Sequence, residues 1–199
     1  MELNFIKDKI VFEKEFNSLD RLVIDFTSIL NRLKINYVLV SGYVSILFGR
    51  NRSSEDIDII LENINLVKFE TVWREAYKEF ECIITEDLKD AYNNYLLKNY
   101  AIRFSRKGNF IPNIEIKFPK LELDSWTLNN KIEVLVNNKQ IFISPIELQI
   151  PFKLFLGSEK DIEDAKYLYS MFRGKLDVPL LTEFNRKLNI VGLFNKYLK

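Results

Sequence analysis

The stretch that most constrains the fold runs from Val38 to Leu61 and reads VLVSGYVSILFGRNRSSEDIDIIL. Its apolar start predicts a buried strand over 37–40, which small residues at 41–42 interrupt. The next apolar residues predict a short helix that ends near Gly49, since glycine commonly follows the end of a helix. A polar, basic loop over 50–54 leads to alternating acidic and aliphatic residues, which predict a strand over 56–61.

The second of these strands carries two acids, Asp56 and Asp58. Residues i and i+2 of a strand point to the same face about 6.5 Å apart, so both carboxylates can meet one ligand. Carboxylates at close range repel each other and raise each other's pKa, and a divalent cation removes that penalty. We therefore expect Asp56 and Asp58 to bind Mg²⁺ (or Mn²⁺) together with phosphate. The alternative is a solvated strand face.

The turn between the first strand and the helix is a candidate anion site. Backbone N–H groups and the positive end of a helix dipole favour negative charge there. Gly42 lets the backbone approach a phosphate closely, and Ser41 offers a hydroxyl. Arg50 and Arg52 add positive charge near the acids. Alternatively, this is an ordinary turn, and the arginines are solvated or pair with Glu55.

Composition excludes several classes of function. The chain has no histidine, which rules out Ser-His-Asp and Cys-His catalysis and HExxH metalloproteases. Its one cysteine forms no intramolecular disulfide, and its glycines match neither the Rossmann nor the Walker spacing. The net charge of +1 does not favour a general nucleic-acid binder. With no signal peptide or membrane span in the pattern, we expect a soluble cytoplasmic protein with no membrane partner.

The rest of the chain predicts helices over 11–33, 65–80 and 86–98, and strands over 100–105, 113–118, 132–136 and 140–143. The sequence Ser144-Pro145-Ile146-Glu147 predicts a helix start, with a serine cap and a proline in the first turn, and several short helices follow. We therefore predict an α+β fold with a mixed sheet. It has an α/β core over 1–143 and a C-terminal helical segment over 144–199, which packs on the core.

The order of elements over 38–61 resembles the nucleotidyltransferase superfamily (DNA polymerase β-like), and within it the minimal and AbiEii-like nucleotidyltransferases. The residues that carry the resemblance are Ser41-Gly42, Gly49-Arg50, Arg52-Ser53-Ser54 and Asp56-Ile57-Asp58. Two residues depart from the family pattern. Ser41 stands where the family has a first glycine, and the bulky Tyr43 follows, which would narrow the phosphate turn or alter nucleotide choice.

The resemblance implies a third acid on a neighbouring strand, and Glu115 is the candidate, although the family usually has aspartate there. In this strand Ile114, Ile116 and Phe118 share one face, while Glu115 and Lys117 share the other. The resemblance assigns Glu115 as a ligand of a second metal ion and an assisting base. The alternative is an amphipathic strand with a cross-strand ion pair.

A second likeness lies over 144–169, where AbiEii-like proteins often carry Lys-Leu and then Lys-Asp-x-x-Asp. Here it implies that Lys153 reaches a nucleotide phosphate and that Asp161 positions the acceptor or a base. The alternatives are a solvated lysine and an acidic first turn that is simply favourable to a helix dipole.

The resemblance implies a metal-dependent enzyme that transfers a nucleoside monophosphate from ATP or another NTP to an acceptor hydroxyl. The acceptor would be RNA, a protein or a small molecule. The AbiEii likeness implies a toxin with a separately encoded antitoxin partner. Two other readings stay open. One is a non-catalytic nucleotide-binding or protein-interaction module on the same fold, and the other is a globular interaction protein whose acids are solvated.

Overall fold

The computed structural model describes residues 2–7 and 9–198. The strands are β1 (Asn4–Ile6), β2 (Lys9–Phe12), β3 (Tyr37–Val40), β4 (Asp56–Leu61), β5 (Phe80–Cys82), β6 (Ile102–Arg106), β7 (Asn113–Lys117), β8 (Ile132–Val136) and β9 (Lys139–Ile143). The helices are α1 (Ser18–Arg32), α2 (Gly42–Leu47), α3 (Leu66–Ala76), α4 (Leu88–Asp90), α5 (Glu122–Asn129), α6 (Ile146–Leu156), α7 (Glu159–Met171), α8 (Val178–Lys187) and α9 (Val191–Leu198). A π-helical turn (Ala91–Tyr95) and a 3₁₀ turn (Leu96–Lys98) continue α4.

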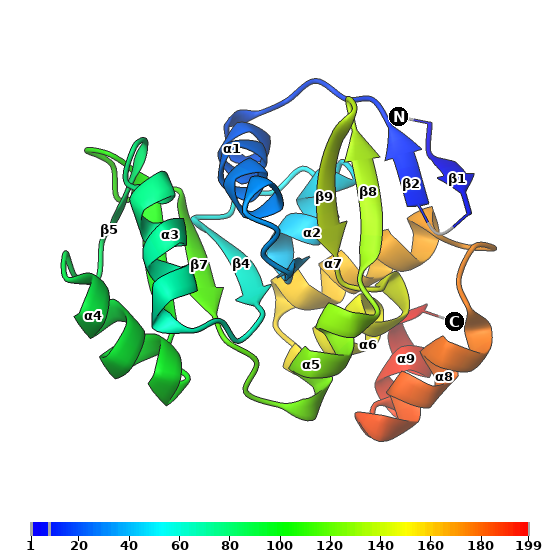
Figure 1. The fold of residues 1–199 in the computed structure, drawn as a ribbon. Helices are drawn as coiled ribbons and strands as arrows, with labels where there is room; N and C mark the ends of the chain where they lie inside the picture. The colour runs from blue at the N-terminus through cyan, green and yellow to red at the C-terminus, as the bar shows by residue number, and fades with distance from the viewer. Residues whose placement is uncertain (1, 8, 199) are drawn as a thin grey trace.

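Within the described residues the strands form one mixed sheet in the order β1-β2-β8-β9-β3-β4-β7-β6-β5. The central strands β3 and β4 are antiparallel, whereas β4 and β7 are parallel. The α+β class predicted from the sequence is confirmed. All strands precede residue 144, and the chain beyond it is helical (Figure 1).

Alternation along the central strands gives the sheet two different faces. The side chains of Ile57, Ile59 and Leu61 join the main core, which helices such as α1 and α3 complete. On the opposite face Val38 and Ile60 pack against α5 in a much smaller apolar cluster. Because Asp56 and Asp58 share the face of Ile60, both acids emerge on the side of the small cluster, where the apolar cover is incomplete.

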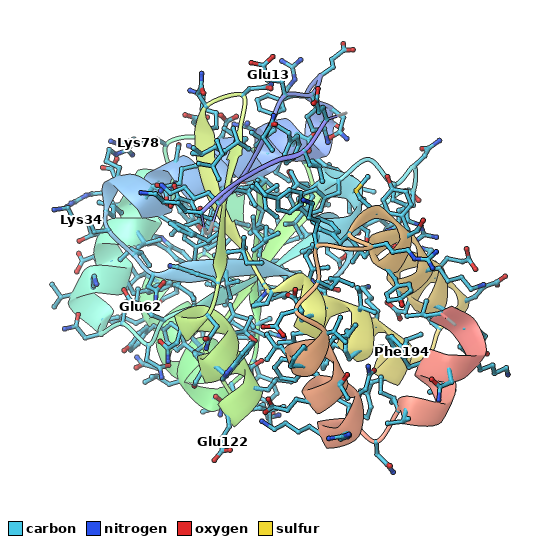
Figure 2. The ribbon with its side chains drawn as sticks, turned by 90° about the vertical axis from the view of Figure 1, so that its right-hand side faces the viewer. Glu13, Lys34, Glu62, Lys78, Glu122 and Phe194 are labelled. Carbon is cyan, nitrogen blue, oxygen red and sulfur yellow. The ribbon has the colours of Figure 1, made fainter. Side chains whose placement is uncertain are left out.

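The C-terminal helices stand beside this second face. Helix α6 lies against α7 and α8, and α2 packs between the sheet and α7 (Figure 1). Seen from the side, Phe194 lies between α9 and the helices that precede it (Figure 2), with its ring centroid 5.5 Å from that of Tyr169. In the described part of the chain, no helix combines the length and the apolar character needed to cross a membrane.

Several boundaries differ from the sequence prediction. The helix predicted over 11–33 begins only at 18, where Asn17 forms a capping box with Asp20, because β2 pairs with β8 over 9–12. The helix predicted over 65–80 ends at Ala76, and β5 follows it. Helix α5 was not predicted.

The predicted serine cap of α6 is also wrong. Pro145 is the N-cap residue, while the hydroxyl of Ser144 is buried and has no hydrogen-bond partner among the described residues.

Candidate active site

Strand register brings the predicted acids side by side. Asp58 of β4 is aligned with Glu115 of β7, and Glu115 is aligned with Arg103 of β6. On the other side of Asp58, its partner across the antiparallel pair is Val40, the last residue of β3. These aligned residues form a row across four strands, in which neighbouring strands lie about 4.8 Å apart. Asp56 lies on the same face as Asp58, two residues earlier.

The pKa of Asp58 lies above its ordinary value of 3.8. Burial of the carboxyl group is the main cause, and the charges of Glu115 and then Asp56 add to it. The ammonium of Lys117 and a hydrogen bond from the Ser41 hydroxyl act in the opposite direction. The neighbouring Asp56 is held by Ser54, whose hydroxyl donates to its backbone carbonyl at 3.0 Å. Negative charge is therefore concentrated where the sequence predicted it.

The third predicted acid is engaged by a neighbour. Arg103 donates two hydrogen bonds to one oxygen of Glu115, from Nε at 2.9 Å and from Nη2 at 2.8 Å. This is the cross-strand ion pair that the sequence left as an alternative. Among residues 2–7 and 9–198, no three acidic or cysteine side chains are grouped so that they could hold a metal ion.

In the turn between β3 and α2, Ser41 adopts a positive φ, a backbone conformation that favours glycine. The backbone of Ser41 has φ 63° and ψ −136°, a conformation that residues other than glycine rarely adopt. Glycine adopts this conformation without strain. At Gly42 the space of a Cβ is filled by the terminal guanidinium nitrogen Nη2 of Arg52. The missing side chain thus makes room for a cation beside the turn.

Tyr43 does not narrow the turn. Its side chain is 1% exposed and its hydroxyl donates to Oδ1 of the buried Asp20 at 2.9 Å. Lys14 completes this cluster, with its Nζ 2.9 Å from Oδ2 of Asp20. The bulky residue therefore anchors α2 to the N-terminal segment and leaves the Ser41 side of the turn open.

Positive side chains gather around Asp164 of α7, which is fully buried. Arg50 pairs with Oδ1 of Asp164, and Arg52 Nη1 lies 3.2 Å from Oδ2. The ammonium of Lys153, 2% exposed, lies 3.0 Å from the same Oδ2 and 2.5 Å from Oδ1 of Asp161. Burial acts to raise the pKa of Asp161, but hydrogen bonds from Lys153 and Ser158 lower it below its usual value. We call these side chains the Asp164 cluster: Arg50, Arg52, Lys153, Asp161 and Asp164.

The Asp164 cluster has three cations and two carboxylates, so it carries an excess of positive charge. Arg52 joins it to the Ser41–Gly42 turn, which lies beside Asp58. The arginines therefore pair with Asp164 and not with Glu55. Lys153 is buried in this ion network and is not solvated.

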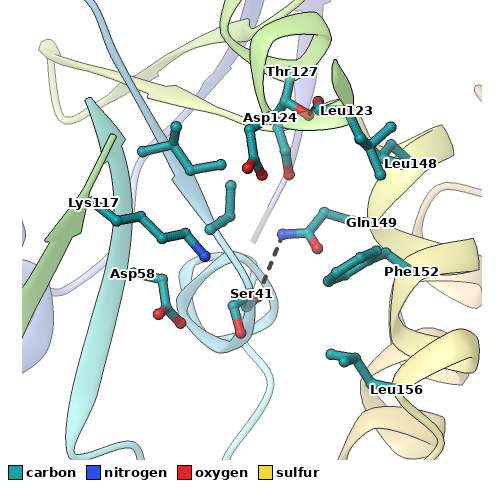
Figure 3. A pocket seen from close by; sticks show the side chains of 13 residues that line it. Ser41, Asp58, Lys117, Leu123, Asp124, Thr127, Leu148, Gln149, Phe152 and Leu156 are labelled. Atoms are coloured by element: carbon teal, nitrogen blue, oxygen red, sulfur yellow. Dashed lines mark hydrogen bonds between the residues drawn. The ribbon is translucent and has the colours of Figure 1, made fainter. Parts of the chain in front are cut away.

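A cavity of about 300 Å³ opens beside Asp58. Its walls come from the ends of β3, β4 and β7 on one side and from α5 and α6 on the other (Figure 3). Its lining is polar at Ser41, Asp58, Lys117, Asp124, Thr127, Ser144 and Gln149, and apolar at Val40, Ile60, Leu123, Leu148, Phe152 and Leu156. Of the residues assigned from the sequence, only Ser41 and Asp58 line it.

Sequence reasoning assigned no functional role to five polar residues of this cavity: Lys117, Asp124, Thr127, Ser144 and Gln149. Lys117 was placed on the face of Glu115, but its contact with the site depends on the pairing of β7 with β4. Asp124 lies on the unpredicted helix α5. Gln149, 2% exposed, donates to the carbonyl of Ser41 at 3.4 Å, a contact between residues 108 positions apart. Only the period-2 pattern of β7 offered a signal, and only for Lys117.

Comparison with known proteins addresses the fold. No protein-family profile matches the sequence, and no curated protein matches it either. The crystal structure of an antigenic nucleotidyltransferase-like protein from Paracoccidioides brasiliensis is similar, with a TM-score of 0.51 and 16% identity over 90% of this chain and 93% of that one. A candidate nucleotidyltransferase from H. pylori aligns with a TM-score of 0.47 and 18% identity over 91% of this chain and 83% of that one. The first of these likenesses shows that the chain has a nucleotidyltransferase-like fold.

Proposed function

We propose that this chain is a metal-dependent nucleotidyltransferase, which transfers a nucleoside monophosphate from an NTP to an acceptor hydroxyl. The observation that carries the proposal is the position of Asp58. It lies beside Asp56 and Glu115 on the sheet face that borders the cavity, next to the Ser41–Gly42 turn between β3 and α2. The nucleotidyltransferase-like fold supports the same activity.

The two aspartates fit a divalent cation. Burial is the main cause of the raised pKa of Asp58, and the negative charges of Glu115 and Asp56 add to it; a cation would offset those charges. We propose that Asp56 and Asp58 hold Mg²⁺ or Mn²⁺, which would shield the phosphates and make the acceptor hydroxyl more acidic. Glu115 would join them only after Arg103 releases it.

The chain's own residues would bind and orient the reactants. The acceptor oxygen attacks the α-phosphorus, the bond from that phosphorus to the bridging oxygen breaks, and pyrophosphate leaves. We propose that Glu115, once Arg103 has released it, accepts the proton of the acceptor hydroxyl, the assisting role that the resemblance implies. The side-chain ammonium of Lys117 has no hydrogen bond or ion pair within the described residues and lies in the cavity beside Asp58, where it is available to bind a phosphate.

The remaining assigned residues would act on the triphosphate. Ser41 and Gly42 would hold its β- and γ-phosphates, with Arg52 directly beside the turn. Arg50, Lys153 and Asp161 belong to the Asp164 cluster. We propose that this cluster holds Arg52 in place, and that the cations Arg50 and Lys153 exchange carboxylate for phosphate partners when a nucleotide binds.

The experiment is a transfer assay with NTPs labelled at the α-phosphate and cell extract as the acceptor source. The wild type is expected to transfer label, and Asp56→Asn and Asp58→Asn are expected to lose transfer. The matched control is Asp87→Asn, an aspartate that caps α4 through the Asp90 amide and does not line the cavity. Retained transfer in both site variants would overturn the proposal.

One observation favours the alternative of a non-catalytic nucleotide-binding module: Glu115 is held by Arg103 and no three-carboxylate group is present in the described residues. An Arg103→Met variant separates the two functions. If it transfers label and the wild type binds NTP without transfer, the wild type is the binding module. Lys9→Met, which also removes an exposed cross-strand pair, with Glu133, is the control.

The acceptor follows from the resemblance alone. We propose that it is RNA, a protein or a small molecule, and that the chain acts as the toxin of an AbiEii-like pair with an antitoxin protein. Unimpaired growth of cells that strongly express the wild type, compared with cells that express Asp58→Asn, would contradict the toxin role.

A further inference from the structure

We propose that Asp124 selects the base of the donor nucleotide, favouring bases with an exocyclic amino group; this inference rests on the proposed function. The proposal rests on the different environments of the two carboxylate oxygens of Asp124. Its Oδ2 accepts from the backbone amides of Lys120 at 2.9 Å and Leu121 at 3.0 Å, at the start of α5. Its Oδ1 has no hydrogen-bond partner among the described residues, and the side chain lines the cavity.

The cavity has the form that a nucleoside needs. Asp58 and Ser41 lie at one end, and Asp124 and Thr127 at the other, with the Phe152 ring on the side wall (Figure 3). With the reacting phosphate at the Asp58 end, the base would reach toward Asp124. Leu148 of α6 lines the same wall, and Val40 and Ile60 of the sheet also line the cavity, so a planar base would contact apolar surface.

The cavity offers hydrogen-bond acceptors in addition to Oδ1 of Asp124. The side-chain amide of Gln149, which lies between the two ends (Figure 3), donates to the Ser41 carbonyl and leaves its oxygen without a partner in the described chain. Ser144 is 2% exposed and lines the same cavity, and its buried hydroxyl has no hydrogen-bond partner in the part of the chain that the structure describes. A carboxylate accepts hydrogen bonds and repels carbonyl oxygens, so it would bind the amino group of guanine, adenine or cytosine and reject the carbonyl edge of uracil or hypoxanthine.

The capping bonds make Asp124→Asn a sharp test. The two backbone amides require an acceptor, so the asparagine oxygen would take the place of Oδ2 and its NH₂ group would face the cavity. The variant therefore keeps the hydrogen bonds that cap α5, and it replaces the acceptor Oδ1 that faces the base with a donor NH₂ group. Asp87→Asn, which alters a capping aspartate of α4 outside the cavity, is the control.

The measurement is equilibrium binding of GTP, ATP, CTP, UTP and ITP with Mg²⁺ and no acceptor. We expect the wild type to bind an amino-bearing triphosphate at least about 10-fold more tightly than its amino-free counterpart, ITP for the purines or UTP for cytosine. Asp124→Asn is expected to lose or reverse this preference, and Asp87→Asn to keep it.

The outcomes separate the two proposals. If the wild type binds triphosphates but Asp124→Asn shows the same preference, or if the wild type prefers UTP or ITP, the role of Asp124 is overturned and the proposed function stands. If the folded wild type binds none of the five, both fall. A change in preference that appears only among acceptor molecules, with NTP binding unaltered, would assign Asp124 to the acceptor and also overturn the inference.

Discussion

The strained turn at Ser41 gives a prediction with a defined size. Ser41 has φ 63°, and a non-glycine residue in such a conformation costs about 1–3 kcal/mol. Ser41→Gly removes this strain, but glycine loses about 0.5–1 kcal/mol more than other residues through the entropy of the unfolded chain. Both Ser41→Gly and Ser41→Ala remove the hydroxyl that hydrogen-bonds Asp58. The difference between the two variants therefore isolates the backbone.

We expect Ser41→Gly to be more stable than Ser41→Ala by about 0.5–2 kcal/mol. For a chain of 199 residues, each kcal/mol shifts Tm by about 2–4 °C. Urea denaturation and thermal melts of both variants, at the same pH and without nucleotide, measure the difference. If Ser41→Ala equals or exceeds Ser41→Gly in stability, the turn is not strained at Ser41 and the reasoning from its backbone angles fails.

Three further predictions concern charge. Asp58→Asn is expected to be more stable than the wild type at pH 7 and equally stable below pH 3.8. The pKa of the Asp58 carboxyl is raised in the folded protein, so its stabilising contribution is complete below the pKa of the unfolded chain. That contribution is lost as pH rises through the folded-state pKa. Urea midpoints across pH check this, and a constant gap would contradict it. Gly42→Ala is expected to lower the free energy of unfolding by about 1–3 kcal/mol because the new methyl group displaces the Arg52 guanidinium. In a helix without such a contact, alanine is more stabilising than glycine, so a gain in Tm would refute the close packing of Arg52 on Gly42. Asp164→Asn is expected to lower the free energy of unfolding by about 3–5 kcal/mol, because it leaves three cations around a neutral group. Asp161→Asn is expected to lower it less, because Lys153 still pairs with Asp164. Equal denaturation midpoints for the two variants would contradict this.

The sequence was sufficient to predict the parts of the fold in which local pattern and tertiary packing agree. The apolar run of β3 and the alternation of β4 and β7 are set by which face each side chain must bury, so their strands match the prediction closely. Over 9–12 and 80–82 the same apolar residues fit either a helix or a strand. These segments are strands because residues 9–12 pair with β8 and residues 80–82 pair with β6. Periodicity within a short window carries no information about pairing with a distant strand.

The candidate site shows the same division. Asp56 and Asp58 were predictable because their spacing on one strand fixes their common face. The engagement of Glu115 by Arg103 depends on the register between β6 and β7, and the burial of Lys153 depends on the contact of α6 with α7. Asp124 was not predicted because α5 has a weak apolar pattern and packs through few residues, such as Leu128.

The most direct test of the nucleotidyltransferase proposal is calorimetric titration of ATP, GTP, CTP and UTP with Mg²⁺ into the wild type and into the Asp56→Asn/Asp58→Asn double variant. Circular dichroism of both proteins first establishes that they are folded. We predict that the wild type binds at least one Mg²⁺–nucleotide and that the double variant loses this binding. Absence of binding to the folded wild type, or equal binding by both proteins, would contradict the assignment of these aspartates as the centre of the site.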